Sequence, residues 1–165
     1  MTGMFGWAQT IEGDFAQTRC IAASGKTIEK AGHITLVYPD NLDMNYSNPD
    51  GEYFILHGNE MSMNMDGKKN KVDTEKNKRT HTFATTLLNC IKGDWEQAAA
   101  DNDADTVVKE EGGNKIVTLT AKKKAPRGYA RIELTYNKAG MLNKMILEEF
   151  GGVTNTYVMS NTTKK

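Results

Sequence analysis

The chain has 165 residues, which is enough for one domain with a sizeable hydrophobic core. Its 21 lysine and arginine residues balance 21 aspartate and glutamate residues, so it lacks the positive field on which nucleic-acid-binding proteins rely. No apolar run approaches the roughly 20 residues that a membrane-spanning helix needs. We therefore expect one soluble domain over residues 1–165, a monomer without a nucleic-acid partner.

The N-terminal segment predicts a strand over residues 11–22 with Phe15 buried, and a short helical turn over residues 3–9 before it. The start lacks the charged region and apolar stretch of a signal peptide. A secreted chain whose signal peptide had been removed would begin in the same way. Residues 23–31 are polar and contain glycine, so we expect a loop or bulge between edge strands there.

Three short runs between residues 32 and 68 place an apolar side chain at every second position. This alternation, interrupted by Pro39 and by the Asp50-Gly51 and Asp66-Gly67 pairs, is typical of antiparallel strands. Because successive side chains point to opposite faces, one face of the sheet should be apolar and the other polar. The apolar positions are Ile34, Leu36, Tyr38, Leu42, Met44, Tyr46, Met61, Met63 and Met65.

A further strand over residues 53–57 completes this region. Residues 68–78 are rich in lysine and asparagine, which indicates a solvated strand edge or loop. The lysines at 68–69 and 122–124 could contact anionic headgroups or an acidic partner. More commonly, such lysines only keep an edge strand from pairing with another molecule.

From residue 80 the apolar period changes to that of a helix. Gly93 fits the end of this helix as a C-cap, and Asp94 can cap a second helix that carries Trp95. The apolar residues on one side of the first helix are Phe83, Leu87, Leu88 and Ile91.

Strands return after the helices, separated by glycine- and asparagine-containing hairpin turns. A sheet this long curls and buries its inner face on the helical layer. The predicted fold class is therefore α+β: a curled antiparallel sheet, an incomplete β-barrel of about ten strands, covered on its concave side by helices. The five later strands are expected at residues 106–110, 115–122, 129–136, 142–149 and 153–159.

The sequence contains no catalytic motif of the G-x-S-x-G, phosphate-loop or H-E-x-x-H kind. His33, His57 and His81 lack ligand spacing, so we interpret them as surface or packing residues. We expect no enzymatic activity, no metal and no cofactor. Cys20 and Cys90 are interpreted as small buried side chains. A disulfide between them would need an oxidising compartment and Cα atoms within about 7 Å.

Several short segments occur in a characteristic order along the chain. They are Phe15-Ala-Gln17-Thr, residues 32–46, the Pro49 turn, Phe54-Ile55-Leu56 with Gly58 and Asn59, and Met65-Asp-Gly67. In this order they resemble the LolA family of periplasmic lipoprotein carriers, with its F-x-Q element, its glycine-led apolar strand that runs into a proline, its aromatic strand and its strand ending in Asp-Gly. The likeness is closest to the LolA-like group from bacteria of the Bacteroides type.

The resemblance implies a periplasmic carrier whose apolar cavity binds the acyl chains of lipoproteins, or another lipid, and delivers them toward the outer membrane. It also implies an inner-membrane releasing complex and an outer-membrane receptor as partners. An alternative is a lipid- or lipoprotein-sensing module that acts through a protein partner. Members of the family place an arginine before the strand-ending proline, where it bonds to helix carbonyls and closes the empty cavity; here that position is Tyr38.

Methionine is unbranched and polarizable, so a methionine-rich sheet face suits a ligand of irregular shape, although an ordinary core is the alternative. We expect the cavity to be lined by Leu36, Tyr38, Leu42, Met44, Tyr46, Phe54, Leu56, Met61, Met63, Met65, Leu87, Ile91, Ile132, Leu134 and Leu147.

Overall fold

The structure is a computed structural model that describes residues 9–124 and 128–165. The described residues form one open sheet of eleven strands, a 3-10 turn and two α-helices. The strands are β1 Thr10–Ile21, β2 Lys26–Val37, β3 Asn41–Asn48, β4 Asp50–His57, β5 Glu60–Met65, β6 Lys68–Asp73, β7 Ala104–Glu111, β8 Asn114–Ala121, β9 Tyr129–Tyr136, β10 Leu142–Glu149 and β11 Val153–Lys164. The helical segments are η1 Thr74–Lys76, α1 Lys78–Lys92 and α2 Trp95–Asp101.

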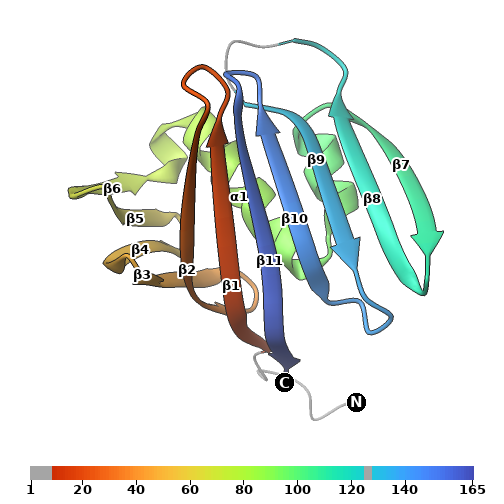
Figure 1. Cartoon of the computed structure of the whole chain (residues 1–165), viewed down its shortest axis with the longest axis horizontal. Coiled ribbons are helices and arrows are strands. Elements are labelled where there is room, and N and C mark those ends of the chain that lie inside the picture. Colours follow the sequence, from red (N-terminus) through yellow and green to blue (C-terminus); the bar gives the residue numbers. More distant parts are fainter. Residues whose placement is uncertain (1–8, 125–127) are drawn as a thin grey trace.

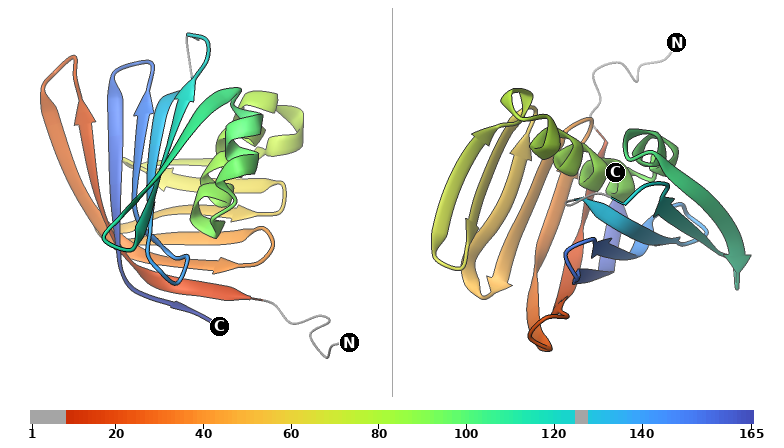
Figure 2. Two further views of the ribbon diagram at one scale, coloured as in Figure 1. Left: turned by 90° about the vertical axis from the view of Figure 1, so that its right-hand side faces the viewer. Right: turned by 90° about the horizontal axis from the view of Figure 1, so that it is seen from above.

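The sheet is a meander with its first and last strands side by side at the centre. Its spatial order is β6-β5-β4-β3-β2-β1-β11-β10-β9-β8-β7, and neighbouring strands are antiparallel. The helices connect β6 at one edge to β7 at the other. Figures 1 and 2 show the sheet curling so that α1 and α2 lie on its concave side. The predicted fold class is confirmed.

The concave face carries the apolar stripe that the alternation predicts. Leu42, Met44 and Tyr46 of β3 are buried, whereas Asp43 and Asn45 between them are more exposed. The same alternation recurs on β1, β4, β8 and β10. The interior is therefore built from every second residue of the strands, facing the helices.

Helix α1 begins and ends as its sequence predicts. The Asn77 side chain accepts a hydrogen bond from the Thr80 N–H at the start, and Gly93 ends the helix with a φ of 90°. Asp94 occupies the N-cap position of α2, as predicted, but its side chain makes no capping hydrogen bond. The expected helical turn over residues 3–9 lies outside the described residues except for Gln9.

The expected loop over residues 23–31 is confirmed only for the turn that ends at Gly25, because β2 begins at Lys26 and pairs with β1 along its whole length. Backbone hydrogen bonds hold the polar residues 26–31 in the sheet without an apolar stripe. The expected solvated strand edge is confirmed for residues 68–73, which form the edge strand β6. A further difference is that β11 continues to Lys164, where it pairs with the start of β1.

The two cysteines differ from expectation in one respect. Cys90 is buried, as predicted, but Cys20 is exposed. Both are free thiols. Cys20 lies on an outward position of β1 between Arg19 and Ile21, so strand alternation and not its chemistry decides its exposure.

Gly32 marks the one place where β2 needs glycine for space. The register of β2 with β3 shifts between Ala31 and Gly32, which brings the backbones unusually close. A Cβ atom at Gly32 would overlap the Asn45 carbonyl oxygen and lie 2.8 Å from the Tyr46 Cα.

We expect Gly32→Ala to lower the free energy of unfolding by about 1–3 kcal/mol, because the clash is with backbone that cannot move aside. Urea denaturation measures the effect. Gly151→Ala is the matched control, since a Cβ there meets nothing within 4 Å. Equal stability of the two variants would contradict this interpretation of Gly32.

Candidate functional site

Helix α1 is fixed to the sheet at its C-terminal end. The Tyr136 hydroxyl donates to the Cys90 carbonyl at 2.6 Å, and the Tyr38 hydroxyl donates to the Lys92 carbonyl at 3.4 Å. In return, the Lys92 ammonium donates to the Pro39 carbonyl at 3.3 Å. Burial raises the pKa of both phenols, and the nearby Asp94 carboxylate adds to the effect, so both remain protonated donors. Tyr38 thus bonds to a helix carbonyl at the position where the resemblance implies an arginine.

The N-terminal part of α1 is not packed in this way. Its buried residues begin at Ala84, and Phe83 is 40% exposed. Near the fixed end, the interior is almost solid, with a crevice of only about 20 Å³ beside Ile91. Toward the other end of the helix, the sheet and α1 separate and leave open space.

This space is a cavity of about 430 Å³, which we call the main cavity. Small-molecule sites in proteins have volumes of roughly 300–1,000 Å³, so it is large enough for a ligand. Two-thirds of its wall is apolar or aromatic side chains. Its lining residues are Gln17, Arg19, Ile21, Ile28, Lys30, Met44, Tyr46, Phe54, Met63, Met65, Asp66, Phe83, Leu87, Tyr129, Leu147, Glu149, Asn155 and Tyr157.

A second, more open hollow of about 880 Å³, the outer cavity, lies beside the start of α1. Four residues line both cavities: Met63, Phe83, Tyr129 and Glu149. The Phe83 ring stacks on Tyr129 with a centroid distance of 5.9 Å and meets Phe54 edge-on at 6.3 Å. Phe83 and Tyr129 therefore stand where the cavities meet, and Phe54 packs beside them in the main cavity.

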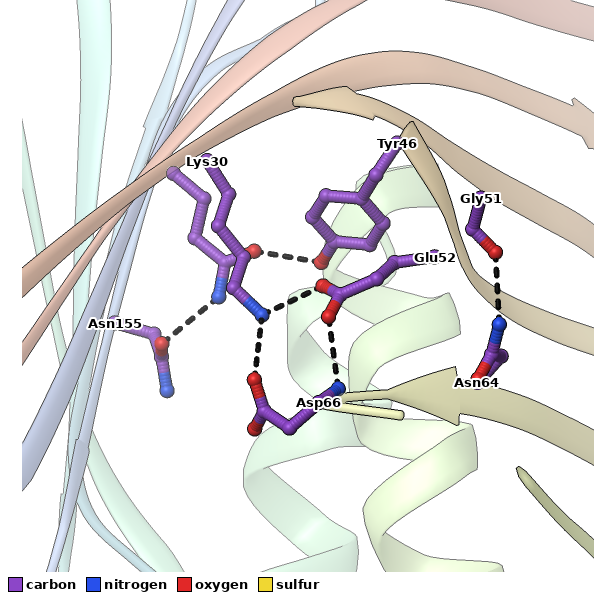
Figure 3. Close-up of polar contacts among 8 residues, drawn as sticks. Lys30, Tyr46, Gly51, Glu52, Asn64, Asp66 and Asn155 are labelled. Atoms are coloured by element: carbon purple, nitrogen blue, oxygen red, sulfur yellow. Dashed lines mark hydrogen bonds and ion pairs between the residues drawn. The ribbon is translucent and has the colours of Figure 1, made fainter. Parts of the chain in front are cut away.

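The main cavity has a polar rim (Figure 3). The Lys30 ammonium pairs with the Glu52 carboxylate at 2.7 Å, and both side chains are about nine-tenths buried. Asp66 completes the rim: its backbone N–H donates to Glu52, and its carboxylate lies 3.8 Å from the Lys30 Nζ. Burial raises the pKa of Glu52, but the hydrogen bonds from Lys30 and Asp66 more than compensate and hold it below its ordinary value of 4.5.

Beside the ion pair, a chain of side-chain hydrogen bonds crosses three strands. The Tyr46 hydroxyl donates to the Gln17 Oε1 at 2.6 Å, and the Gln17 amide donates to the Asn155 Oδ1 at 2.9 Å. Burial holds the pKa of Tyr46 far above its ordinary value. The rim thus joins β1, β2, β3, β4 and β11 through groups that satisfy one another.

The structure brings together about half of the residues that we expected to line a cavity. Six of the expected residues line neither a cavity nor the crevice: Leu36, Tyr38, Leu42, Leu56, Ile132 and Leu134. Met61 lines only the outer cavity, and Ile91 lines only the small crevice. The expected residues that line the main cavity are Met44, Tyr46, Phe54, Met63, Met65, Leu87 and Leu147.

Sequence reasoning missed the polar and aromatic half of the wall. Phe83 shares a helix face with Leu87, and Gln17 follows Phe15 by two residues, so periodicity could have found both. Tyr129 could not have been found this way, because the extra residue Ala130 in β9 shifts the register with β10 and turns Tyr129 inward. Glu149 follows the buried Leu147 by two residues, so alternation places it on the inward face, and it lines both cavities.

The described part of the chain contains no group of three or more histidine, cysteine, aspartate and glutamate side chains that could hold a metal ion. Neither helix in that part is long and apolar enough to cross a membrane.

An open half-barrel with a partly hollow, mostly apolar interior defines a ligand-binding fold. The family model described as outer membrane lipoprotein carrier protein LolA matches residues 7–165, so the chain belongs to the LolA family. No sequence among the curated proteins matches it.

Solved structures are similar to this chain at low sequence identity. The MucA/MucB complex of Pseudomonas aeruginosa matches at 14% identity and a TM-score of 0.53, over 94% of this chain and 52% of that chain. A LolA superfamily protein from Nitrosomonas europaea matches at 10% identity and a TM-score of 0.44, over 93% and 85%. A DUF1329 family protein from Desulfovibrio piger matches at 11% identity and a TM-score of 0.47, over 95% and 86%.

The ion pair in the rim predicts a pH-dependent stability. Because the pKa of Glu52 is lower in the folded protein than in the unfolded chain, its contribution is present above about pH 4.5 and is lost as the pH falls through the folded value. We expect Glu52→Gln to lower the free energy of unfolding at pH 7 by about 1–3 kcal/mol, because Lys30 loses its partner. This difference from the wild type should shrink below pH 4.5.

Urea denaturation at a series of pH values tests this prediction. Glu60→Gln removes the partner of Lys71 from a pair whose side chains are both mostly exposed, so it should change stability by less than about 1 kcal/mol. If the stability difference between the wild type and Glu52→Gln stayed constant with pH, the Glu52 carboxylate would not be its source.

Proposed function

We propose that this protein is a periplasmic carrier that binds the acyl chains of lipoproteins, or of another lipid, in the main cavity and delivers them toward the outer membrane. The observation that carries the proposal is the hollow of about 430 Å³ between sheet and α1, in a chain of the LolA family. Its wall includes Met44, Met63 and Met65, which can adapt to a flexible chain.

The energetics of such a site suit reversible binding. Each methylene shielded from water contributes about 0.8 kcal/mol, so a chain of several carbons is held without any charged contact. Release of the lipid to a receptor requires that the carrier does not bind it too tightly. The exposed N-terminal part of α1 can move away from the sheet at little cost in buried area, while its C-terminal end stays bonded to Tyr38 and Tyr136.

The route of the cargo is part of the proposal. An inner-membrane releasing complex would supply the lipid, and an outer-membrane receptor would take it up. Membership of the Bacteroides-type group, a monomeric state and the absence of enzymatic activity stay predictions.

The second candidate is a lipid- or lipoprotein-sensing module that acts through a protein partner. One observation favours it: the MucA/MucB structure, which shares this fold, is a complex of two proteins. Recovery of a signalling protein from periplasmic extract with this protein, without lipoprotein release from spheroplasts, would support sensing over transport.

We expect Met63→Asp to weaken binding of a fluorescent fatty acyl probe by at least about tenfold, because a carboxylate in the cavity opposes an apolar ligand. The side chain borders open space, so the melting temperature should change little. Fluorescence titration and thermal melting measure the two effects.

Ser62→Asp is the matched control, since it places the same charge on the other face of β5 and should leave binding unchanged. An equal loss of binding and stability in Met63→Asp would indicate an ordinary core instead of a binding site. Native mass spectrometry of protein purified from its host provides an independent test, in which the carrier function requires co-purified lipid or lipoprotein.

A further inference from the structure

The Tyr129 hydroxyl is buried and has no hydrogen-bond partner among the described residues. The residue is only 8% exposed. Two other phenols of the interior have partners: Tyr46 donates to Gln17, and Tyr136 donates to the Cys90 carbonyl. A buried hydroxyl without a partner destabilises the state in which it occurs, so Tyr129 calls for a physical explanation.

The position of Tyr129 associates it with the ligand site. Alternation from the buried Ile132 would point residue 129 outward, but the register of β9 with β10 shifts between Arg131 and Tyr129 and turns the ring into the interior. Tyr129 lines both the main and the outer cavity. Tyr129 therefore stands at the junction of the two hollows, with its hydroxyl buried.

The ring of Phe83 covers Tyr129. The two rings stack at 5.9 Å with an interplanar angle of 23°. Phe83 belongs to the N-terminal part of α1 and is 40% exposed, which makes it the more accessible of the two rings. A ligand that displaced Phe83 would uncover the Tyr129 hydroxyl.

The chemistry of the junction selects the group that would bind there. Burial raises the pKa of Tyr129, so its hydroxyl stays neutral and donates a hydrogen bond. Glu149, the register neighbour of Tyr129, also lines both cavities, and its acidic group disfavours a carboxylate or phosphate beside it. A neutral acceptor, such as the carbonyl of an acyl ester or amide, fits both conditions.

We propose that the Tyr129 hydroxyl donates a hydrogen bond to the ester or amide carbonyl of the bound acyl group, at the junction of the two cavities. This inference rests on the proposed carrier function and deepens it. The apolar walls hold hydrocarbon of any kind, whereas Tyr129 distinguishes a chain attached through a carbonyl from one attached through an ether.

The test compares two lipids that differ by one carbonyl, monolauroylglycerol and dodecylglycerol ether, at concentrations where both are monomeric. Each displaces a fluorescent apolar probe from the full chain. For each variant, the affinity for the ester is divided by the affinity for the ether. This ester-to-ether ratio should be about tenfold higher in the wild type than in Tyr129→Phe, because a hydrogen bond of about 1.4 kcal/mol corresponds to that factor. The melting temperature of Tyr129→Phe without ligand should be equal to or higher than that of the wild type, because an unsatisfied hydroxyl is removed.

Tyr46→Phe is the control, since it removes a cavity hydroxyl that already has a partner. It should lower the melting temperature and leave the ester preference unchanged. If both lipids displaced the probe and the ester-to-ether ratio were the same in the wild type and in Tyr129→Phe, the carrier function would stand and the Tyr129 hydrogen bond would be overturned. A destabilised Tyr129→Phe that lost both lipids equally would also overturn it, since the hydroxyl would then be structural. If neither lipid displaced the probe from the wild type, the carrier function itself would fail.

Discussion

A straight helix can follow a curved sheet over only part of its length. Helix α1 has 15 residues and is about 22 Å long, and it crosses the concave side of a sheet whose two edges it helps to connect. Its C-terminal carbonyls are bonded to Tyr38 and Tyr136, and beside Ile91 only a small crevice remains. At its other end, the 3-10 turn η1 is bonded to the sheet through Thr74 and Asn59. Between these attachments the first turns of α1 are mostly exposed, and both cavities lie beside them.

On the sheet side of the hollow, the inward residues change from apolar to polar along the strands. The inward positions of β1 pass from Phe15 through Gln17 to Arg19, and those of β2 pass from Ile34 to Lys30. Polar groups cannot pack against hydrocarbon without partners, and here they bond to one another across five strands. The polar groups therefore satisfy one another at the rim, where the apolar wall of the cavity ends.

The fold was predictable from the sequence because its signals are local. Alternation located β3, β4 and β5, and the change of period located α1, with Gly93 ending it. The start of β2 was missed because residues 26–31 are held by backbone pairing with β1 and by the close approach at Gly32, neither of which leaves an apolar pattern. The site was less predictable. Alternation identifies the inward residues, such as Leu36 and Met63, but it cannot tell which of them pack against the helix and which face a void.

The pairing of β1 with β11 has a consequence for how the protein reaches its folded state. Their register runs from Ile11 opposite Lys164 to Ile21 opposite Val153, so the two central strands come from opposite ends of the sequence. Contacts between distant segments form slowly, because a large loop must close first. The edge of β1 therefore receives its partner only after the last residues of the chain have been synthesised, and until then the backbone groups along that edge have no strand to pair with.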